Sequence, residues 1–251
     1  MNTINEQLFE PIPHVKVPDK KYKRVEFLPE VCEKLSRMTN QSVCVVDYSK
    51  RNFFYVSPHP LFLCGYTPQE VKEMGYSFFE KVLSPKDLQM VLELNKCAWE
   101  LFHTLVPAER TNACFAYDVC LHHKNGLQFL VNRKLSPAFL TEQGDVWLAI
   151  STVTLSSKKT SGNVVFTQND ISEYYSYDFA KKKIVEYKFQ KLTKREREIY
   201  ALLIRGFDTK EIAQTLQTST LTVQSHCKNI RKLLKASSIA SAVTMYYNSK
   251  F

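Results

Sequence analysis

The feature that most constrains this fold is a series of short helices with their own start signals in residues 192–248. The first helix begins with Thr193 and has Glu196 three residues later, and Asp208 and Glu211 repeat this spacing for the second. A capping oxygen followed three residues later by a glutamate satisfies the free amide groups at a helix start. The four predicted helices are LTKREREIYALLIRG, DTKEIAQTL, TSTLTVQSHCKNIRKLLK and SSIASAVTMYYN. Four short helices with tight connections predict an all-α helix-turn-helix domain.

The third predicted helix has one apolar face and one polar face. Val223, Cys227, Ile230 and Leu234 recur at helical spacing and predict a buried stripe. Cys227 is therefore expected in the core, and His226 at its edge, packed and hydrogen bonded. A metal site for this pair is disfavoured, because neighbours on a helix point about 100° apart and no second cysteine–histidine pair lies at zinc-binding spacing.

The net charge of +9 is concentrated near the C-terminus. Residues 181–251 hold 15 lysine and arginine residues against 5 acidic ones, a net charge of +10, whereas residues 1–180 have a net charge of −1. Such an excess in a compact module favours a polyanionic partner, and duplex DNA is the partner we predict. The lysine run at 181–183 is interpreted as a solvated turn.

The earlier part of the chain has strand and helix signals in a different order. Residues 42–57 and 114–137 each hold two apolar runs around a polar turn and predict β-hairpins, and residues 145–155 predict a fifth strand. Helix starts at Thr67 and Ser84 lie between the hairpins. This order predicts a five-stranded antiparallel sheet with helices on one face, so the whole chain is expected to be α+β.

Three stretches of this region resemble a PAS-type sensor domain. They are VVDYSKRNFFYVSP, LCGYTPQEV and SPKDL, and the likeness extends over residues 40–155. The resemblance implies a sensing or dimerisation domain, but it names no small-molecule ligand, and no cofactor is predicted. The expected domains are an N-terminal extension with a helix (1–40), the PAS-like domain (41–157), a linker or hairpin (158–190) and the helix-turn-helix domain (191–251).

The C-terminal motifs resemble the DNA-binding domain of LuxR-type transcription regulators. LTKRE, EIA, TV and the histidine of LTVQSHCKNIRKLL carry this likeness within residues 190–250. The roles implied are phosphate contact for Thr209 and Lys210, positioning of the third helix for Ser219, Thr220 and Thr222, base contact for Gln224, Ser225 and Lys228, and further DNA contact for Arg231 and Lys232. The family usually has a basic residue where Gln224 stands, and glutamine favours adenine in bidentate readout.

Several other classes of protein are disfavoured because the sequence lacks their characteristic motifs. We find no glycine-rich phosphate loop, nucleophile elbow or HExxH motif, so an enzyme is not predicted. No run of 18 apolar residues occurs, so no membrane span is expected. The seven cysteines lack CxxC spacing and are interpreted as reduced thiols of a cytoplasmic protein.

The predicted function is that of a sequence-specific DNA-binding transcription regulator that acts as a homodimer. A receiver-type response regulator is disfavoured, because no alternating strand and helix units surround Asp47. A polymerase-associated, sigma-like factor stays open as an alternative, since LTKRERE also suits such helices. RNA polymerase is therefore a further candidate partner.

Two sets of residues keep alternative interpretations. Cys114, Cys120 and His122 share one face of a predicted strand, where they can pack against neighbours or contact haem or a metal; packing is favoured. The second set is a stripe on the fourth helix that either closes the core of its own domain or pairs with a second copy: Ile239, Ala242, Val243 and Tyr246.

Overall fold

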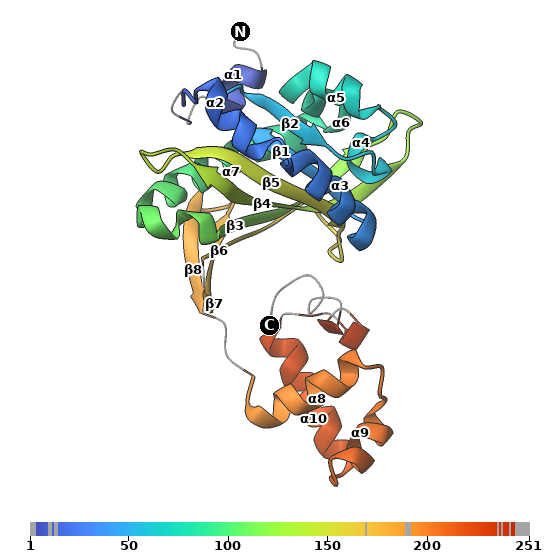
Figure 1. The fold of residues 1–251 in the computed structure, drawn as a ribbon. Coiled ribbons are helices and arrows are strands. Elements are labelled where there is room, and N and C mark those ends of the chain that lie inside the picture. Colours follow the sequence, from blue (N-terminus) through green and yellow to red (C-terminus); the bar gives the residue numbers. More distant parts are fainter. Residues whose placement is uncertain are drawn as a thin grey trace. The chain divides into compact units, whose positions relative to one another are not determined.

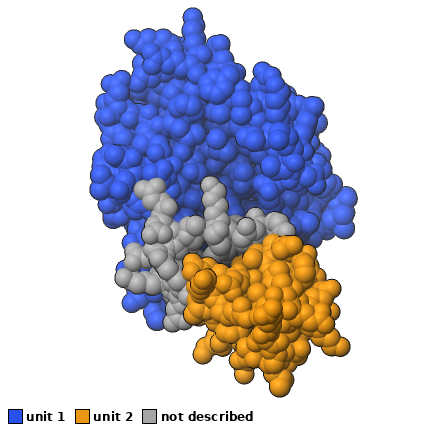
Figure 2. Space-filling view, turned by 60° about the horizontal axis from the view of Figure 1, so that its bottom comes forward, with its two compact units in different colours: residues 1–169, 175–186 blue, residues 170–174, 187–251 orange. Residues whose placement is uncertain are grey.

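The structure is a computed structural model with two compact units. It describes residues 4–9, 12, 15–168, 170–188, 192–234, 236, 238–240 and 242–243. The first unit comprises residues 1–169 and 175–186, and the second comprises residues 170–174 and 187–251 (Figure 2). Each unit has a hydrophobic core of its own. None of the helices in the described ranges is long and apolar enough to cross a membrane.

An eight-stranded sheet is the centre of the first unit (Figure 1). Its strands are β1 (Ser42–Asp47), β2 (Asn52–Val56), β3 (Ala113–His122), β4 (Gln128–Leu140), β5 (Val146–Leu155), β6 (Gly162–Gln168), β7 (Asp170–Asp178) and β8 (Lys183–Lys188). They lie in the order β2-β1-β5-β4-β3-β6-β7-β8. All pairings with a described register, from β2 across to β6, are antiparallel.

The two predicted hairpins and the predicted fifth strand are confirmed. β1 pairs with β2, and β3 pairs with β4 around a turn in which the His123 amide donates to the Leu127 carbonyl. Gly126 in this turn has φ +87°, a backbone conformation that residues with a Cβ atom rarely adopt. The order of the first five strands places the first hairpin beside β5, the last of the five predicted strands.

The helices of the first unit precede the sheet or connect β2 to β3. They are α1 (Ile4–Phe9), α2 (Asp19–Tyr22), α3 (Leu28–Thr39), α4 (Pro60–Leu63), α5 (Pro68–Met74), α6 (Phe78–Val82) and α7 (Pro85–Thr104), with 3₁₀ turns η1 (Lys23–Val25), η2 (Gly75–Ser77) and η3 (Pro107–Asn112). The predicted starts are confirmed, since Thr67 forms a capping box with Glu70 and the Ser84 hydroxyl accepts from the Asp87 amide.

Helices cover both faces of the sheet, so the prediction of helices on one face is wrong. Leu28 and Cys32 of α3 pack with Val43, Val45 and Trp147, in a cluster separate from the main core. Figure 1 shows α3 lying along the sheet. The reason is visible in β1, whose six residues are all buried, because a strand that is apolar on both faces needs cover on both.

The predicted number of five strands is too small for this sheet. β6, β7 and β8 lie within segment 158–190, which the sequence left open between a hairpin and a linker. β6 pairs with β3, and Phe166 opposite Phe115 joins the main core. The sheet therefore continues beyond the five predicted strands. The lysine run at 181–183 is exposed as predicted, with Lys181 and Lys182 in the turn and Lys183 at the start of β8.

The second unit contains three described helices, α8 (Lys194–Ile204), α9 (Thr209–Thr215) and α10 (Thr220–Leu233). Both predicted capping boxes are confirmed, at Thr193 with Glu196 and at Asp208 with Glu211. Gly206, with φ +89°, ends the first of these helices. The predicted fourth helix lies partly outside the described residues; of its stripe, Ile239, Ala242 and Val243 are described and Tyr246 is not.

Candidate nucleic-acid interface and sensor cavity

One face of α10 is fixed in the core of the second unit. Val223, Cys227 and Ile230 are buried there and Leu234 packs at the edge, as the helical spacing predicts. Burial raises the pKa of the Cys227 thiol, because the charged thiolate is poorly solvated in this position. The structure therefore makes Cys227 a protonated core residue, and it fixes which side of α10 faces outward.

The outward face of α10 is polar and basic. Thr222, Gln224, Ser225, Lys228 and Lys232 are all exposed on it. No acidic residue occurs between Thr220 and Leu233. A rigid rod with amide, hydroxyl and ammonium groups on one side has the donors and acceptors that read base edges in the major groove.

The start of α10 is held by a short network. The Ser219 hydroxyl accepts from the Thr222 amide at 3.1 Å, and the two side-chain oxygens lie 2.8 Å apart. The preceding turn is closed by the Thr218 amide, which donates to the Ala213 carbonyl at 2.9 Å. These contacts position α10 relative to α9, a helix-turn-helix arrangement.

Arg195 is a positioning residue that the sequence motifs did not single out. Its Nη2 donates to the Leu216 carbonyl at 2.8 Å, so α8 contacts the turn between α9 and α10 directly. Its Nη1 also pairs with Glu198 at 3.0 Å. No local signal could have found the contact with Leu216, because the two residues are 21 positions apart in the sequence.

The carboxylates between residues 192 and 234 are engaged within the second unit, whereas several cations of the same range are not. Each acidic residue between 192 and 234 caps a helix or pairs with Arg195; they are Glu196, Glu198, Asp208 and Glu211. Hydrogen bonds from the backbone of Glu211 and Lys210 lower the pKa of the Asp208 carboxyl. Among the described residues, Lys210, Lys228 and Lys232 form no ion pair. The unit thus presents uncompensated positive charge.

Four of the residues singled out from the sequence are half-buried, and two of these have a buried nitrogen atom without a partner in the described part of the chain. Arg231 is half-buried, and its Nε has no hydrogen-bond partner within the described part of the chain. His226 lies at the core edge as predicted, but its buried Nδ1 likewise has no partner there, so the expected hydrogen bond at this atom is not seen. Thr209 and Thr220 are half-buried at the starts of their helices.

The structure brings no metal-binding cluster together in the ranges it describes. No group of three or more His, Cys, Asp or Glu side chains could hold an ion there. Cys114, Cys120 and His122 are half-buried on one face of β3, whereas Ala113, Tyr117, Val119 and Leu121, on its other face, join the main core. Their alternate positions along β3 therefore place them on one face of the sheet, and they form no metal site in the described ranges.

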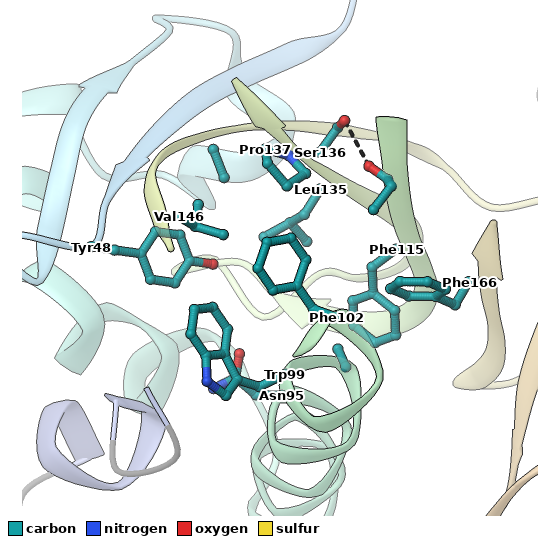
Figure 3. A pocket seen from close by; sticks show the side chains of 13 residues that line it. Tyr48, Asn95, Trp99, Phe102, Phe115, Leu135, Ser136, Pro137, Val146 and Phe166 are labelled. Carbon is teal, nitrogen blue, oxygen red and sulfur yellow. Dashed lines mark hydrogen bonds between the residues drawn. The ribbon is translucent and has the colours of Figure 1, made fainter. Parts of the chain in front are cut away.

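The first unit contains a cavity between α7 and the sheet. Its volume is about 70 Å³, and most of its lining is aromatic or aliphatic (Figure 3). Trp99 and Phe102 come from α7, and Phe115 and Phe166 come from neighbouring strands. At its edge the Ser136 hydroxyl donates to the Ala113 carbonyl at 2.8 Å.

A second cavity of about 30 Å³ lies beside the first. Tyr48, Asn95, Phe115 and Leu135 line both cavities, which makes them contiguous. The second cavity is more polar, since its lining also includes Arg133 and two tyrosines. Leu8, Phe9 and Ile12 of the N-terminal segment form one of its walls.

Comparison with known proteins places the second unit in a regulatory family. Residues 190–246 match the family described as bacterial regulatory proteins, luxR family. The spore germination protein GerE of Bacillus subtilis is 44% identical over 52 residues, which cover 21% of this chain and 70% of GerE. The tetrathionate response regulatory protein TtrR of Salmonella typhimurium is 27% identical over 124 residues, which cover 45% of this chain and 57% of TtrR. The chain therefore spans little more than half of TtrR.

A similar solved structure is the VqmA dimer of Vibrio cholerae in the absence of its target DNA. It is 14% identical, the match covers 90% of this chain and 86% of that chain, and the TM-score is 0.34.

Proposed function

The chain belongs to the LuxR family of bacterial regulatory proteins, a family of DNA-binding transcription regulators, and on this premise we propose how it reads DNA. α10 enters the major groove with its polar face toward the bases. Gln224, Ser225 and Lys228 contact base edges there. The observation that carries this assignment is the exposed face of α10, which has no carboxylate.

The residues around α10 supply phosphate contacts and orientation. Thr209 and Lys210 lie at the start of α9 and contact the backbone, while Arg231 and Lys232 extend the contact from the end of α10. Ser219, Thr220 and Thr222 set the direction of α10 through the network at its start. Leu221, 77% exposed beside these residues, is an apolar side chain suited to a thymine methyl group.

A duplex selected from a random-sequence library tests this reading. The full chain is expected to bind the selected duplex without added RNA polymerase, and scrambled duplex much more weakly. A requirement for polymerase would favour the sigma-like alternative. Equal affinity for selected and scrambled duplexes would contradict sequence-specific reading by α10.

We propose further that the protein works in the cytoplasm, where bacterial DNA lies, as a homodimer on paired half-sites. One helix reads few base pairs, and two linked modules multiply the affinity of weak individual contacts. The described residues of the fourth-helix stripe supply little surface for this pairing, because Ala242 is fully buried and Ile239 and Val243 pack on the core of their own unit.

The apolar surface that suits pairing lies on α3 of the first unit and on Phe27, the residue just before this helix. Phe27, Val31, Leu35 and Met38 recur at helical spacing and are 55%, 42%, 45% and 81% exposed. Four exposed apolar side chains in one row are unusual on a monomer surface. We define these four residues as the α3 stripe and propose that it contacts the α3 stripe of a second copy.

Charge along α3 favours two copies running antiparallel. Glu30 and Glu33 lie in its first half, and Lys34 and Arg37 in its second half. In an antiparallel pair related by a two-fold axis, the acidic half of each helix faces the basic half of the other. Light scattering after size exclusion is expected to show a dimer for the native chain and a monomer for Leu35→Glu. Leu127→Glu, at an apolar residue 63% exposed elsewhere, is the matched control and should stay dimeric. A dimeric Leu35→Glu protein would contradict the α3 interface.

The first unit is proposed as the sensor. The two contiguous cavities between α7 and the sheet bind a small molecule, and its binding changes the DNA-binding activity of the chain. Their mixed lining, with apolar rings in one cavity and polar groups in the other, suits one small molecule with a polar end.

A further inference from the structure

The second cavity contains a buried cation, Arg133 of β4. The residue is only 5% exposed. Its Nε donates to the Ser151 hydroxyl at 3.2 Å, its Nη1 donates to the Tyr117 hydroxyl at 3.1 Å, and its guanidinium lies 4.9 Å from the centre of the Phe79 ring. These partners orient the side chain without neutralising it.

No anion compensates this guanidinium in the described part of the chain. Arg133 pairs with no carboxylate there. Burial raises the pKa of the Cys44 thiol and of the Tyr76 hydroxyl, so both neighbours stay uncharged at neutral pH. Arginine itself remains protonated in proteins. A buried charge without a counter-charge is costly, and a bound anion would remove that cost.

The second cavity places further hydrogen-bonding groups beside Arg133. Tyr117 and Asn95 line it together with the guanidinium and can donate further hydrogen bonds. The contiguous larger cavity offers the faces of Trp99 and Phe102 for an apolar ring. Figure 3 shows these rings gathered around the larger cavity, with Asn95 beside Trp99.

We propose that the two cavities together bind a small aromatic acid, with its carboxylate on Arg133 and its ring against Trp99 and Phe102. The assignment rests on the proposed sensor function and names the chemical class of its ligand. Arg133 supplies a charge-assisted and preferably bidentate contact to the carboxylate. Combined cavity volumes of about 70 and 30 Å³ restrict the ligand to roughly one ring with short substituents.

Matched pairs of charged and neutral probes test this class of ligand on the full chain. Benzoate, salicylate and nicotinate are compared with benzamide, salicylamide and nicotinamide, which keep the ring and lose the charge. Binding is followed by calorimetry and by tryptophan fluorescence, since Trp99 lines the cavity. At least one acid is expected to bind about tenfold or more tightly than its amide.

The variant Arg133→Met removes the charge at similar volume, and Arg133→Lys retains a charge without the planar fork. Circular dichroism first establishes that each variant folds. Folded Arg133→Met should bind acid and amide equally, whereas Arg133→Lys should retain part of the preference. If a variant fails to fold, the comparison of acids with amides on the native chain still decides.

Binding of the selected duplex DNA by the native chain is measured in parallel. A native chain that does not bind this duplex would contradict the proposed regulator function, and not only the proposed ligand. Native protein that binds DNA but binds no acid more tightly than its amide would overturn the ligand class. An acid preference that survives in folded Arg133→Met would overturn the role of Arg133.

Discussion

The two units place their cationic side chains in opposite ways. In the second unit, Lys210, Lys228 and Lys232 extend into solvent from α9 and α10. In the first unit, Arg133 is enclosed between strands and aromatic rings. The exposed charges lie in a region of high positive net charge, whereas the buried charge belongs to a region with nearly balanced charge.

This difference determines what each cation can recognise. Exposed lysines interact weakly one by one, are screened by salt and gain affinity only when many act on a polyanion. A buried arginine is screened little, holds fixed geometry and acts on one group at a time. The same charge therefore suits duplex DNA in one unit and a single carboxylate in the other.

The largest expected effect is a difference in salt dependence between the two units. Raising salt from about 50 to 200 mM should weaken binding of the selected duplex roughly a thousandfold through counterion release. Binding of the preferred aromatic acid should change only about twofold over the same range, since its contact is buried. Fluorescence anisotropy and calorimetry in the same buffers measure both. Similar salt dependences for the binding of DNA and of the acid would contradict the distinction between exposed and buried cations.

Lys228→Ala should weaken binding of the selected duplex by about 1–3 kcal/mol, because it removes a base contact. Lys159→Ala, at an exposed lysine of the first unit, is the matched control and should have little effect. Titrations at one salt concentration give both values. Equal losses of DNA affinity for the two variants would show that Lys228 does not contact the bases.

Cys227→Ala should lower the free energy of unfolding of the second unit by about 1 kcal/mol through lost packing. Ser225→Ala, on the exposed side of the same helix, should change it by less than about 0.5 kcal/mol. Denaturant titration followed by circular dichroism measures both variants. Metal analysis of native protein adds a second check, because stoichiometric metal that is lost in Cys227→Ala would contradict a purely structural cysteine.

The smallest effect concerns the cap of α9. Hydrogen bonds from two backbone amides lower the native pKa of the Asp208 carboxyl below its ordinary value of 3.8. A lowered native pKa contributes stability that is present above 3.8 and is lost as the pH falls through the native value. Asp208→Asn keeps a capping oxygen but cannot titrate. The difference in thermal midpoint between native protein and Asp208→Asn should shrink as the pH falls below 3.8. A difference in thermal midpoint that stays constant with pH would show that the charge of Asp208 does not contribute to stability.

The two units also differ in how far the sequence predicts them. The capping boxes and the buried stripe of α10 depend on residues within a few positions of one another, and these predictions are confirmed. The extension of the sheet depends on β3 accepting β6 as a neighbour across some fifty residues. A hairpin pattern alone does not determine which strand edge receives the next strand.

For the same reason, sequence patterns do not identify side chains whose contact partners lie far away in the sequence. Arg133 stands between Asn132 and Lys134 in the sequence, which hides its place on the core face of β4. Only its contacts with Ser151 and Tyr117 fix its burial. Arg195 contacts the turn before α10 through a carbonyl that no motif marks. The second apolar face of β1 is the exception, because the continuous run from Val43 to Val46 already indicates a strand covered on both sides.

The central claim, that DNA recognition resides in the second unit, is tested most directly by dividing the chain. Fragments 1–186 and 187–251 are prepared separately, and anisotropy with the selected duplex measures the affinity of each. Fragment 187–251 is predicted to bind, more weakly than the full chain because it lacks the α3 stripe, and with the same steep dependence on salt. DNA binding by fragment 1–186 but not by a folded fragment 187–251 would contradict the claim.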